Sequence, residues 1–303
     1  MAEQYDAVIV GGGPAGTSCA IWLARLGLTP LLLEAAPQLG GLVRHNPFVD
    51  NWLAVLPGLT GREMAENMTH SVASAGVVTR LDARVRHIER CASGWSVQTA
   101  GEARDERIRA RHVVIASGTT ARPLPGQSAD AHFAGVLVGP GVHVAEQDYR
   151  GKSVAVLGGG DNAFENYSFV RSAGAAEVHI YARSIRAQNQ WVERARIADV
   201  HFGPYAVEPA ARRVNGRQYD LILVFYGWEP RATFVDHLPI ARHSAGYLTT
   251  DARTAETSVP GIYAIGEVAH RMHPCVATAL ADGVVAAKAI QARCQVQVQT
   301  PFG

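Results

Sequence analysis

Cysteine is scarce in this chain of 303 residues: there are four, Cys19, Cys91, Cys275 and Cys294, and no two are close in sequence. The C-x-x-C spacing of a dithiol redox pair or of a zinc site is therefore missing. Dithiol–disulfide exchange needs an attacking thiolate and a second sulfur within bonding reach, and zinc sites of this kind need clustered ligands. We therefore expect neither a dithiol centre nor a metal site.

Net charge and long apolar runs are also lacking. The chain has 28 Lys and Arg against 27 Asp and Glu, a formal charge of +1, so neither nucleic acid nor an anionic membrane is expected as a partner. No apolar stretch approaches the roughly 18 residues of a membrane span, and no basic segment followed by a long hydrophobic one opens the chain. We expect a cytoplasmic protein with reduced thiols.

Glycine is plentiful, with 30 residues, and two glycine clusters have similar surroundings. In the first, an apolar run is followed by Gly11, Gly13 and Gly16, a helical pattern and a second apolar run that ends in Glu34. The glycines allow a tight turn, close approach of a pyrophosphate and packing of helix on strand, and the acid can accept from ribose hydroxyls. This order of strand, glycines, helix, strand and acid predicts a dinucleotide-binding unit.

The second cluster is Gly158, Gly160 and Ala163, again between an apolar run and a helical pattern. Its second strand ends without an acid and is followed by Arg183 and Arg186. An acid there would repel a ribose 2′-phosphate, whereas arginines can pair with one, so this unit favours NADP over NAD. The alternative is that both arginines belong to a solvated loop.

Eight short motifs are spread over the chain. They are GGGPAG (11–16), QLGG (38–41), DNW (50–52), PGLTG (57–61), IASGT (115–119), GGGDNA (158–163), YGWEP (226–230) and TSVPGIYAIGEV (257–268). Together they resemble the flavoproteins of the low-molecular-weight thioredoxin reductase type. The resemblance implies an α/β fold of two dinucleotide-binding, Rossmann-like domains, the second inserted into the first. An FAD-binding domain would comprise 1–118 and 241–303, and a NAD(P)-binding-like domain 119–240, in a homodimer.

Carried over position by position, the resemblance implies which residues hold the cofactors. For FAD they are Gly11, Gly13, Gly16, Glu34, Gly40, Gly41, Asn51, Gly266, Glu267, Ala277 and Thr278. For NADPH they are Gly158, Gly160, Ala163, Arg183 and Arg186. Ala277 and Thr278 would begin a helix whose N-terminus points at the pyrimidine edge of the flavin, where its partial positive charge stabilises the reduced ring.

The sequence departs from the pattern of that family in three places. The acid after Gly266 is aspartate in the family, and here it is Glu267, one methylene longer. The family's 2′-phosphate motif begins His-Arg-Arg, whereas the first two positions here are Tyr181 and Ala182. The redox-active C-x-x-C would fall on residues 141–144, which read GVHV.

The absent cysteines decide the functional hypothesis. We expect that the chain is not a thioredoxin reductase, because the sulfurs for that reaction are missing. The segment before the second glycine cluster is also similar to that of the thioredoxin-reductase-like ferredoxin and flavodoxin–NADP reductases, which lack these cysteines. His143 stands at the family's cysteine position and is the candidate for proton relay to flavin N5 or to a substrate, unless it is an ordinary surface histidine.

The sequence therefore predicts a cysteine-independent, FAD-dependent oxidoreductase. NADPH would reduce the flavin, and electrons would pass to a ferredoxin- or flavodoxin-type protein, a quinone, oxygen or a small metabolite. A second hypothesis is a flavin oxidase of a small biosynthetic intermediate with a vestigial nicotinamide site, and a third is a flavin-binding protein without catalysis. The acceptor, the choice between NADPH and NADH, and a role for Cys275 at the flavin stay open.

Overall fold

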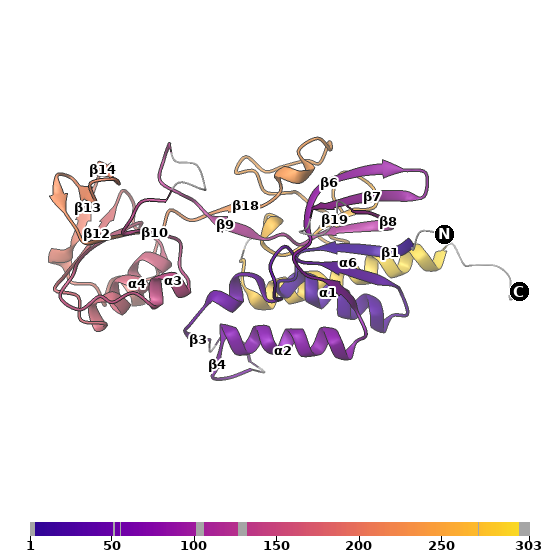
Figure 1. Cartoon of the computed structure of the whole chain (residues 1–303), viewed down its shortest axis with the longest axis horizontal. Helices are drawn as coiled ribbons and strands as arrows, with labels where there is room; N and C mark the ends of the chain where they lie inside the picture. Colours follow the sequence, from indigo (N-terminus) through magenta and orange to yellow (C-terminus); the bar gives the residue numbers. More distant parts are fainter. Residues whose placement is uncertain are drawn as a thin grey trace, which may run out of the picture. The chain divides into compact units, whose positions relative to one another are not determined.

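The chain forms two compact units, the second inserted into the first. The computed structural model describes residues 4–50, 52–54, 56–100, 106–126, 132–271 and 273–296. The first unit combines Met1–Thr119 with Pro230–Gly303, and the second is Thr120–Glu229 (Figure 1). The predicted α/β class with two Rossmann-like sheets is confirmed. The domain limits expected at 118/119 and 240/241 stay a prediction.

A seven-stranded sheet forms the centre of the first unit, in the order β5-β2-β1-β8-β7-β6, with β19 also paired to β8. The strands that pair in parallel are β1 (Gln4–Val10), β2 (Pro30–Leu33), β5 (Val78–Arg80), β8 (Glu106–Ile115) and β19 (Ile262–Ala264). The antiparallel hairpin consists of β6 (Arg84–Cys91) and β7 (Gly94–Ala100). All four residues of β2 are buried, as expected for a strand covered on both faces.

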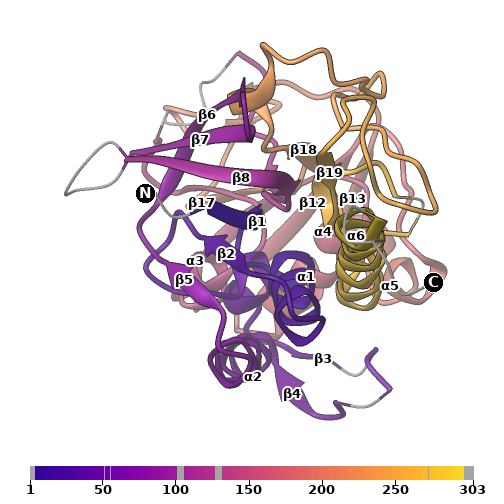
Figure 2. The ribbon, with the colours of Figure 1, turned by 90° about the vertical axis from the view of Figure 1, so that its right-hand side faces the viewer.

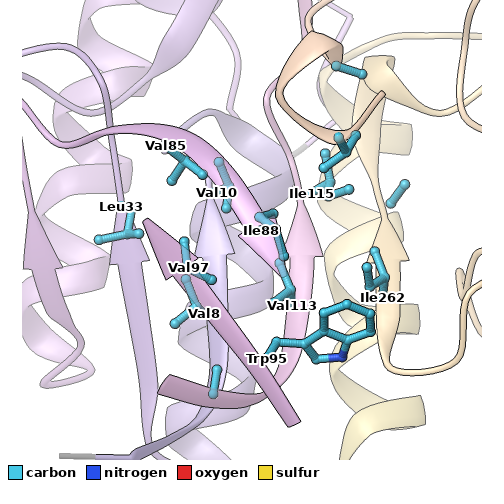
Figure 3. Close-up of a cluster of buried hydrophobic side chains, with 14 of the residues drawn as sticks. Val8, Val10, Leu33, Val85, Ile88, Trp95, Val97, Val113, Ile115 and Ile262 are labelled. Carbon is cyan, nitrogen blue, oxygen red and sulfur yellow. The ribbon is translucent and has the colours of Figure 1, made fainter. Parts of the chain in front are cut away.

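β1 separates two apolar clusters, because successive side chains of a strand point to opposite faces. Ala7 and Ile9 belong to the cluster under three helices, which cover one face of the parallel strands (Figure 2). The helices are α1 (Pro14–Arg25), α2 (Gly61–Ser74) and α6 (Val276–Val296). Val8 and Val10 belong to the other cluster, beneath the β6–β7 hairpin (Figure 3).

Close contact between α1 and α6 fixes the two ends of the first unit's chain to each other. A Cβ at Gly283 would lie 2.6 Å from Ala15 O and 2.7 Å from Cys19 N, so only glycine fits there. The unit's short elements are η1 (Gly41–His45), β3 (Val49–Asp50), β4 (Leu59–Thr60), η3 (Thr233–Val235) and η4 (Gly266–Val268). Within the described ranges, no helix combines the length and the apolar character needed to cross a membrane.

The second unit is built on five parallel strands in the order β10-β17-β11-β12-β13. They are β10 (Val136–Val138), β11 (Ser153–Leu157), β12 (Glu177–Ala182), β13 (Val200–Phe202) and β17 (Leu221–Val224). Its helices are α3 (Val142–Ala145), α4 (Asp161–Ser172), α5 (Asn189–Val192) and η2 (Ile197–Asp199). A small antiparallel sheet contains β14 (Val207–Glu208), β15 (Arg213–Val214) and β16 (Arg217–Gln218).

The two passages of the chain between the units run side by side. They form a two-stranded sheet of β9 (Thr119–Ala121) and β18 (Trp228–Pro230). Beyond the end of β9, the N–H of Arg122 donates to Gly227 O at 2.9 Å. The inserted unit is thus connected through a pair of strands rather than through two separate loops.

His112 and Tyr263 are an unusual polar pair within the first unit. They lie on neighbouring strands, β8 and β19, with ring centroids 5.9 Å apart. Both the Nδ1 atom of His112 and the hydroxyl of Tyr263 are buried, and neither has a hydrogen-bond partner among the described residues. Burial, and to a lesser extent the charge of Arg293, lowers the pKa of His112 from 6.5 to about 4.

We predict that His112 makes the folded chain sensitive to mild acid. Below pH 6.5 the unfolded chain binds a proton that folded His112 does not, so the free energy of unfolding should fall by about 1–2 kcal/mol by about pH 5, allowing for partial exposure. Urea unfolding between about pH 7.5 and 5 measures this, and His112→Leu should flatten the slope. His273→Leu, at an exposed position, is the control and should keep the pH dependence of the unfolding free energy. If that dependence is as steep in His112→Leu as in His273→Leu, the prediction is wrong.

Candidate functional site

The first glycine turn is shaped by contacts within the protein itself. Gly11 has φ +112°, and a Cβ there would overlap Ala116 O. A Cβ at Gly16 would overlap Gly11 O, because α1 presses on the turn that precedes it. These two glycines are therefore required by the fold, whether or not a nucleotide binds.

Gly13 is different, because the space beside it is open. A Cβ at Gly13 would have only one neighbour among the described atoms, Gly41 Cα at 3.9 Å. The second glycine pair comes to the same place, since the N–H of Gly40 donates to Gly12 O at 2.8 Å. Gly13 is also the N-cap of α1 and has no side-chain cap, so the first-turn N–H groups face this space. The two glycine segments form a cradle that fits a pyrophosphate.

Glu34 follows β2 and sits directly beside the glycine turn. The N–H of Gly12 donates to Glu34 Oε2 at 2.6 Å, and the N–H of Ala36 donates to Oε1 at 2.8 Å. These bonds hold the carboxylate at the carboxyl edge of the sheet, where parallel strands place their ligands. Each oxygen keeps a lone pair that can accept from a ribose hydroxyl.

Gly266 and Glu267, in η4, lie against the start of α1. Gly266 has φ +68°, and a Cβ there would lie 2.8 Å from Ala15 Cβ. Its N–H donates to Asp282 Oδ2 at 3.0 Å, and Arg271 Nε donates to the same oxygen at 2.8 Å. The backbone N–H of Gly266 is therefore occupied by Asp282, so any contact of Gly266 with a cofactor must use other atoms.

The side chain of Glu267 is held by Thr119, at the start of β9. Thr119 is buried, and its hydroxyl donates to Glu267 Oε2 at 2.9 Å. This bond orients Glu267, which is one methylene longer than the aspartate found at this position in the resembled family. Thr119 and Asp282 were both missed from sequence, because neither belongs to a spacing pattern.

Thr278 lies in the first turn of α6 and closes that turn together with Cys275. The N–H of Cys275 donates to Thr278 Oγ1 at 3.0 Å, and the N–H of Thr278 approaches Cys275 Sγ at 3.5 Å. This is the geometry of a reciprocal helix cap with a thiol in the usual place of a hydroxyl. The Thr278 side chain is therefore engaged in capping, and Ala277 presents only backbone and a methyl group. Asn51 lies outside the described residues.

The second glycine turn repeats the arrangement of the first. Gly158 has φ +140°, and a Cβ there would overlap Phe225 O, while one at Gly159 would overlap Ser184 O. At Gly160, the N-cap of α4, an added Cβ would have no neighbour within 4 Å. Ala163 is fully buried and packs α4 onto the sheet. The open position is again the one at the helix N-terminus.

A cavity of about 520 Å³ lies beside this turn, entirely within the second unit. Its charged and hydroxyl-bearing walls include Arg122, Arg183, Arg186, Glu229, Tyr205 and Tyr226. The two predicted arginines are therefore brought together with the second glycine cluster. Arg122 is a third cation that the sequence did not identify, because it lies outside both glycine motifs.

Hydrogen bonds hold the arginine segment against the glycine turn. The N–H groups of Arg186 and Ala187 both donate to Gly159 O, at 2.7 and 3.0 Å. Asp161 accepts from both the backbone N–H and the side-chain amide of Gln188, at 2.7 and 2.8 Å. The segment that carries Arg183 and Arg186 is thus positioned by Gly159 in the glycine turn and by Asp161, the first residue of α4.

His143 lies on α3 of the second unit, with an exposed side chain. Its Nε2 is 3.2 Å from Val138 O, so a protonated Nε2 donates there and leaves Nδ1 as the acceptor. Within the part of the chain that the structure describes, no three His, Cys, Asp or Glu side chains gather as a metal site would require.

Comparisons with known proteins agree with this geometry. The family model described as "Pyridine nucleotide-disulphide oxidoreductase" matches residues 5–283. A thioredoxin reductase of Mycolicibacterium smegmatis is 29% identical over 93% of this chain and 94% of its own length. A bifunctional thioredoxin reductase/thioredoxin of Mycobacterium leprae is 28% identical over 93% of this chain, which spans 64% of that protein. The crystal structure of Lactococcus lactis thioredoxin reductase superposes with a TM-score of 0.79 at 26% identity, covering 97% of this chain and 99% of that one.

The expectation that the chain is not a thioredoxin reductase is wrong. Both sequence relatives and the solved structure are thioredoxin reductases, and each matches almost the whole of this chain. The expectation relied on the absence of one four-residue motif, C-x-x-C at 141–144, and gave less weight to the similarity over the rest of the chain. The two predicted cofactors, FAD and NADPH, are those of this family.

We predict that Gly13→Ala separates FAD binding from folding. The new methyl group meets only Gly41, so the chain should fold with an unchanged urea midpoint. The same methyl group should occupy the pyrophosphate cradle and lower the FAD content of purified protein about tenfold or more. Gly16→Ala is the matched control, and because its methyl group overlaps Gly11 O it should destabilise the fold itself. Full FAD content in Gly13→Ala would refute the cradle.

Proposed function

Because this chain belongs to the pyridine nucleotide-disulphide oxidoreductase family, we propose that it transfers electrons from NADPH through FAD to an acceptor without an internal pair of cysteines. Overall, NADPH, a proton and an oxidised two-electron acceptor become NADP⁺ and the reduced acceptor. When bound, FAD would supply the redox chemistry, because a flavin can accept a hydride equivalent and release electrons singly or in pairs.

The chain's own residues would bind and orient the cofactors. The cradle of Gly13 and Gly41 would hold the FAD pyrophosphate against the first-turn N–H groups of α1, and Glu34 would accept from the ribose. The glycine turn before α4, with Arg183 and Arg186, would hold NADPH. The open space beside each helix N-terminus is the observation that carries this assignment.

The environments of the four cysteines support electron transfer without a dithiol. Burial raises the pKa of the Cys19 and Cys294 thiols, which keeps them protonated and unreactive near neutral pH. Cys91 is half-buried and Cys275 exposed, and none of the four is in a disulfide. No C-x-x-C pair occurs anywhere in the sequence. The acceptor would therefore take its electrons directly from the flavin.

The proposed partners follow from the same argument. A protein electron carrier or a small oxidised molecule could be the acceptor, and thioredoxin is included among the candidates to be compared. His143 is proposed as the residue that takes up or returns a proton, through its Nδ1. We also propose a homodimer.

We predict that NADPH reduces the bound flavin directly. Anaerobic titration of the yellow holo-protein should bleach the visible flavin absorbance at a ratio of about one NADPH per flavin, because a hydride carries both electrons. NADH in parallel should require a higher concentration, since it lacks the phosphate that the arginines would bind. Retention of full flavin colour with excess NADPH would eliminate the reductase proposal.

We also predict that turnover survives removal of each sulfur. The variants Cys91→Ser, Cys275→Ser, Cys19→Ala and Cys294→Ala should each keep NADPH-dependent turnover within about threefold, since no thiol takes part in the transfer. Serine at Cys275 preserves a helix-capping group, which separates a redox role from a structural one. Thioredoxin, ferredoxin, flavodoxin, quinone and oxygen are to be compared as acceptors. A variant that binds FAD normally, is reduced by NADPH, and yet fails with every acceptor would contradict the prediction.

A further inference from the structure

A hydrogen-bonded pair of tyrosines lines the cavity in the second unit. The hydroxyl of Tyr205 donates to Tyr226 Oη at 3.0 Å, and both side chains line the cavity together with Arg183. Since Tyr205 gives its proton to Tyr226, the hydroxyl proton of Tyr226 is left for another acceptor. A cation and a hydroxyl donor therefore line the same cavity.

The two residues at the start of the resembled family's phosphate motif do not reach this cavity. Tyr181 and Ala182, at the end of β12, are only 4% and 1% exposed. The hydroxyl of Tyr181 pairs with that of Tyr219 at 2.7 Å, and Tyr219 in turn lies 3.1 Å from Nδ1 of His179. These side chains belong to the interior of the unit, so phosphate recognition must use other donors.

We propose that Tyr226, with Tyr205 and Arg183, binds the phosphate monoester of a phosphorylated adenosine ribose and so determines the preference for NADPH over NADH. The inference rests on the proposed NADPH-dependent function. A phosphate monoester carries nearly two negative charges and has three acceptor oxygens. A guanidinium and a phenol both donate hydrogen bonds, and neither carries a negative charge that would repel the phosphate. Glu229 also lines the cavity, and its carboxylate would repel a phosphate placed close to it.

The protonation of the two phenols agrees with a donor role. Burial is the main cause that raises the pKa of both Tyr205 and Tyr226, so both remain protonated near neutral pH. The charge of Arg183, which lines the same cavity, acts on the pKa of both hydroxyls in the opposite direction. The loop that carries Arg183 is fixed by its bonds to Gly159.

The test measures binding of two nucleotide fragments that lack nicotinamide. Holo-protein is titrated calorimetrically with 2′,5′-ADP and with 5′-AMP, which differ by the ribose phosphate. The wild type should bind 2′,5′-ADP more tightly. Tyr226→Phe removes one hydrogen bond to a charged group, so it should weaken 2′,5′-ADP about tenfold and leave 5′-AMP within about twofold. Tyr219→Phe is the matched control, because its hydroxyl lies outside the cavity lining, and it should change neither.

The outcomes distinguish this inference from the proposed function. Unchanged selectivity in Tyr226→Phe, or equal loss of both ligands, would overturn the role of Tyr226 in phosphate recognition. A wild type that binds both fragments equally would overturn it as well. Selective binding of 2′,5′-ADP that depends on Tyr226, in a protein whose flavin NADPH does not reduce, would support the inference and overturn only the proposed reductase function.

Discussion

Contact between backbone and backbone, at places where any side chain would intrude, is the constraint on which both units depend. In the first unit α1 meets the turn before it at Gly16 and Gly11. In the second, the turn meets Phe225, directly after β17, at Gly158 and the arginine loop at Gly159. With helix, turn and strand so close, the N-terminus of each helix opens onto the carboxyl edge of a parallel sheet. Glu34, after β2, and Arg183 and Arg186, after β12, then lie beside that opening.

Much of this arrangement could be predicted from the sequence, because it depends on local order. Strand, glycines, helix and strand follow one another in each unit, and Glu34 comes at the end of a strand that must neighbour β1. In the first cluster the spacing also assigned separate roles, with Gly13 beside the pyrophosphate and Gly11 and Gly16 serving the turn and the helix packing. In the second cluster the sequence made no such distinction, and only the atoms opposite each Cα show that Gly160 has open space beside it.

The residues that sequence reasoning missed are those whose partners are distant in the chain. Thr119 and Glu267 are 148 positions apart, and neither has a motif that names the other. Asp282 is a single acid in a helix of small residues, and only the fold reveals that it occupies the N–H of Gly266. Asp161 was visible beside the glycines, but its hold on Gln188 depends on how the arginine loop folds back. Such contacts tune a site whose general position is already determined by local sequence.

The cap that begins α6 bears on how cysteine chemistry in this protein would be interpreted. Cys275 is exposed, and its sulfur accepts the N–H of Thr278 while Thr278 accepts the N–H of Cys275. An alkylating reagent such as iodoacetamide would add a substituent to that sulfur and break the reciprocal pair, so the first turn of α6 would fray. Inactivation by such a reagent would then report loss of helix geometry at the site's edge. It would not by itself identify a sulfur that carries electrons.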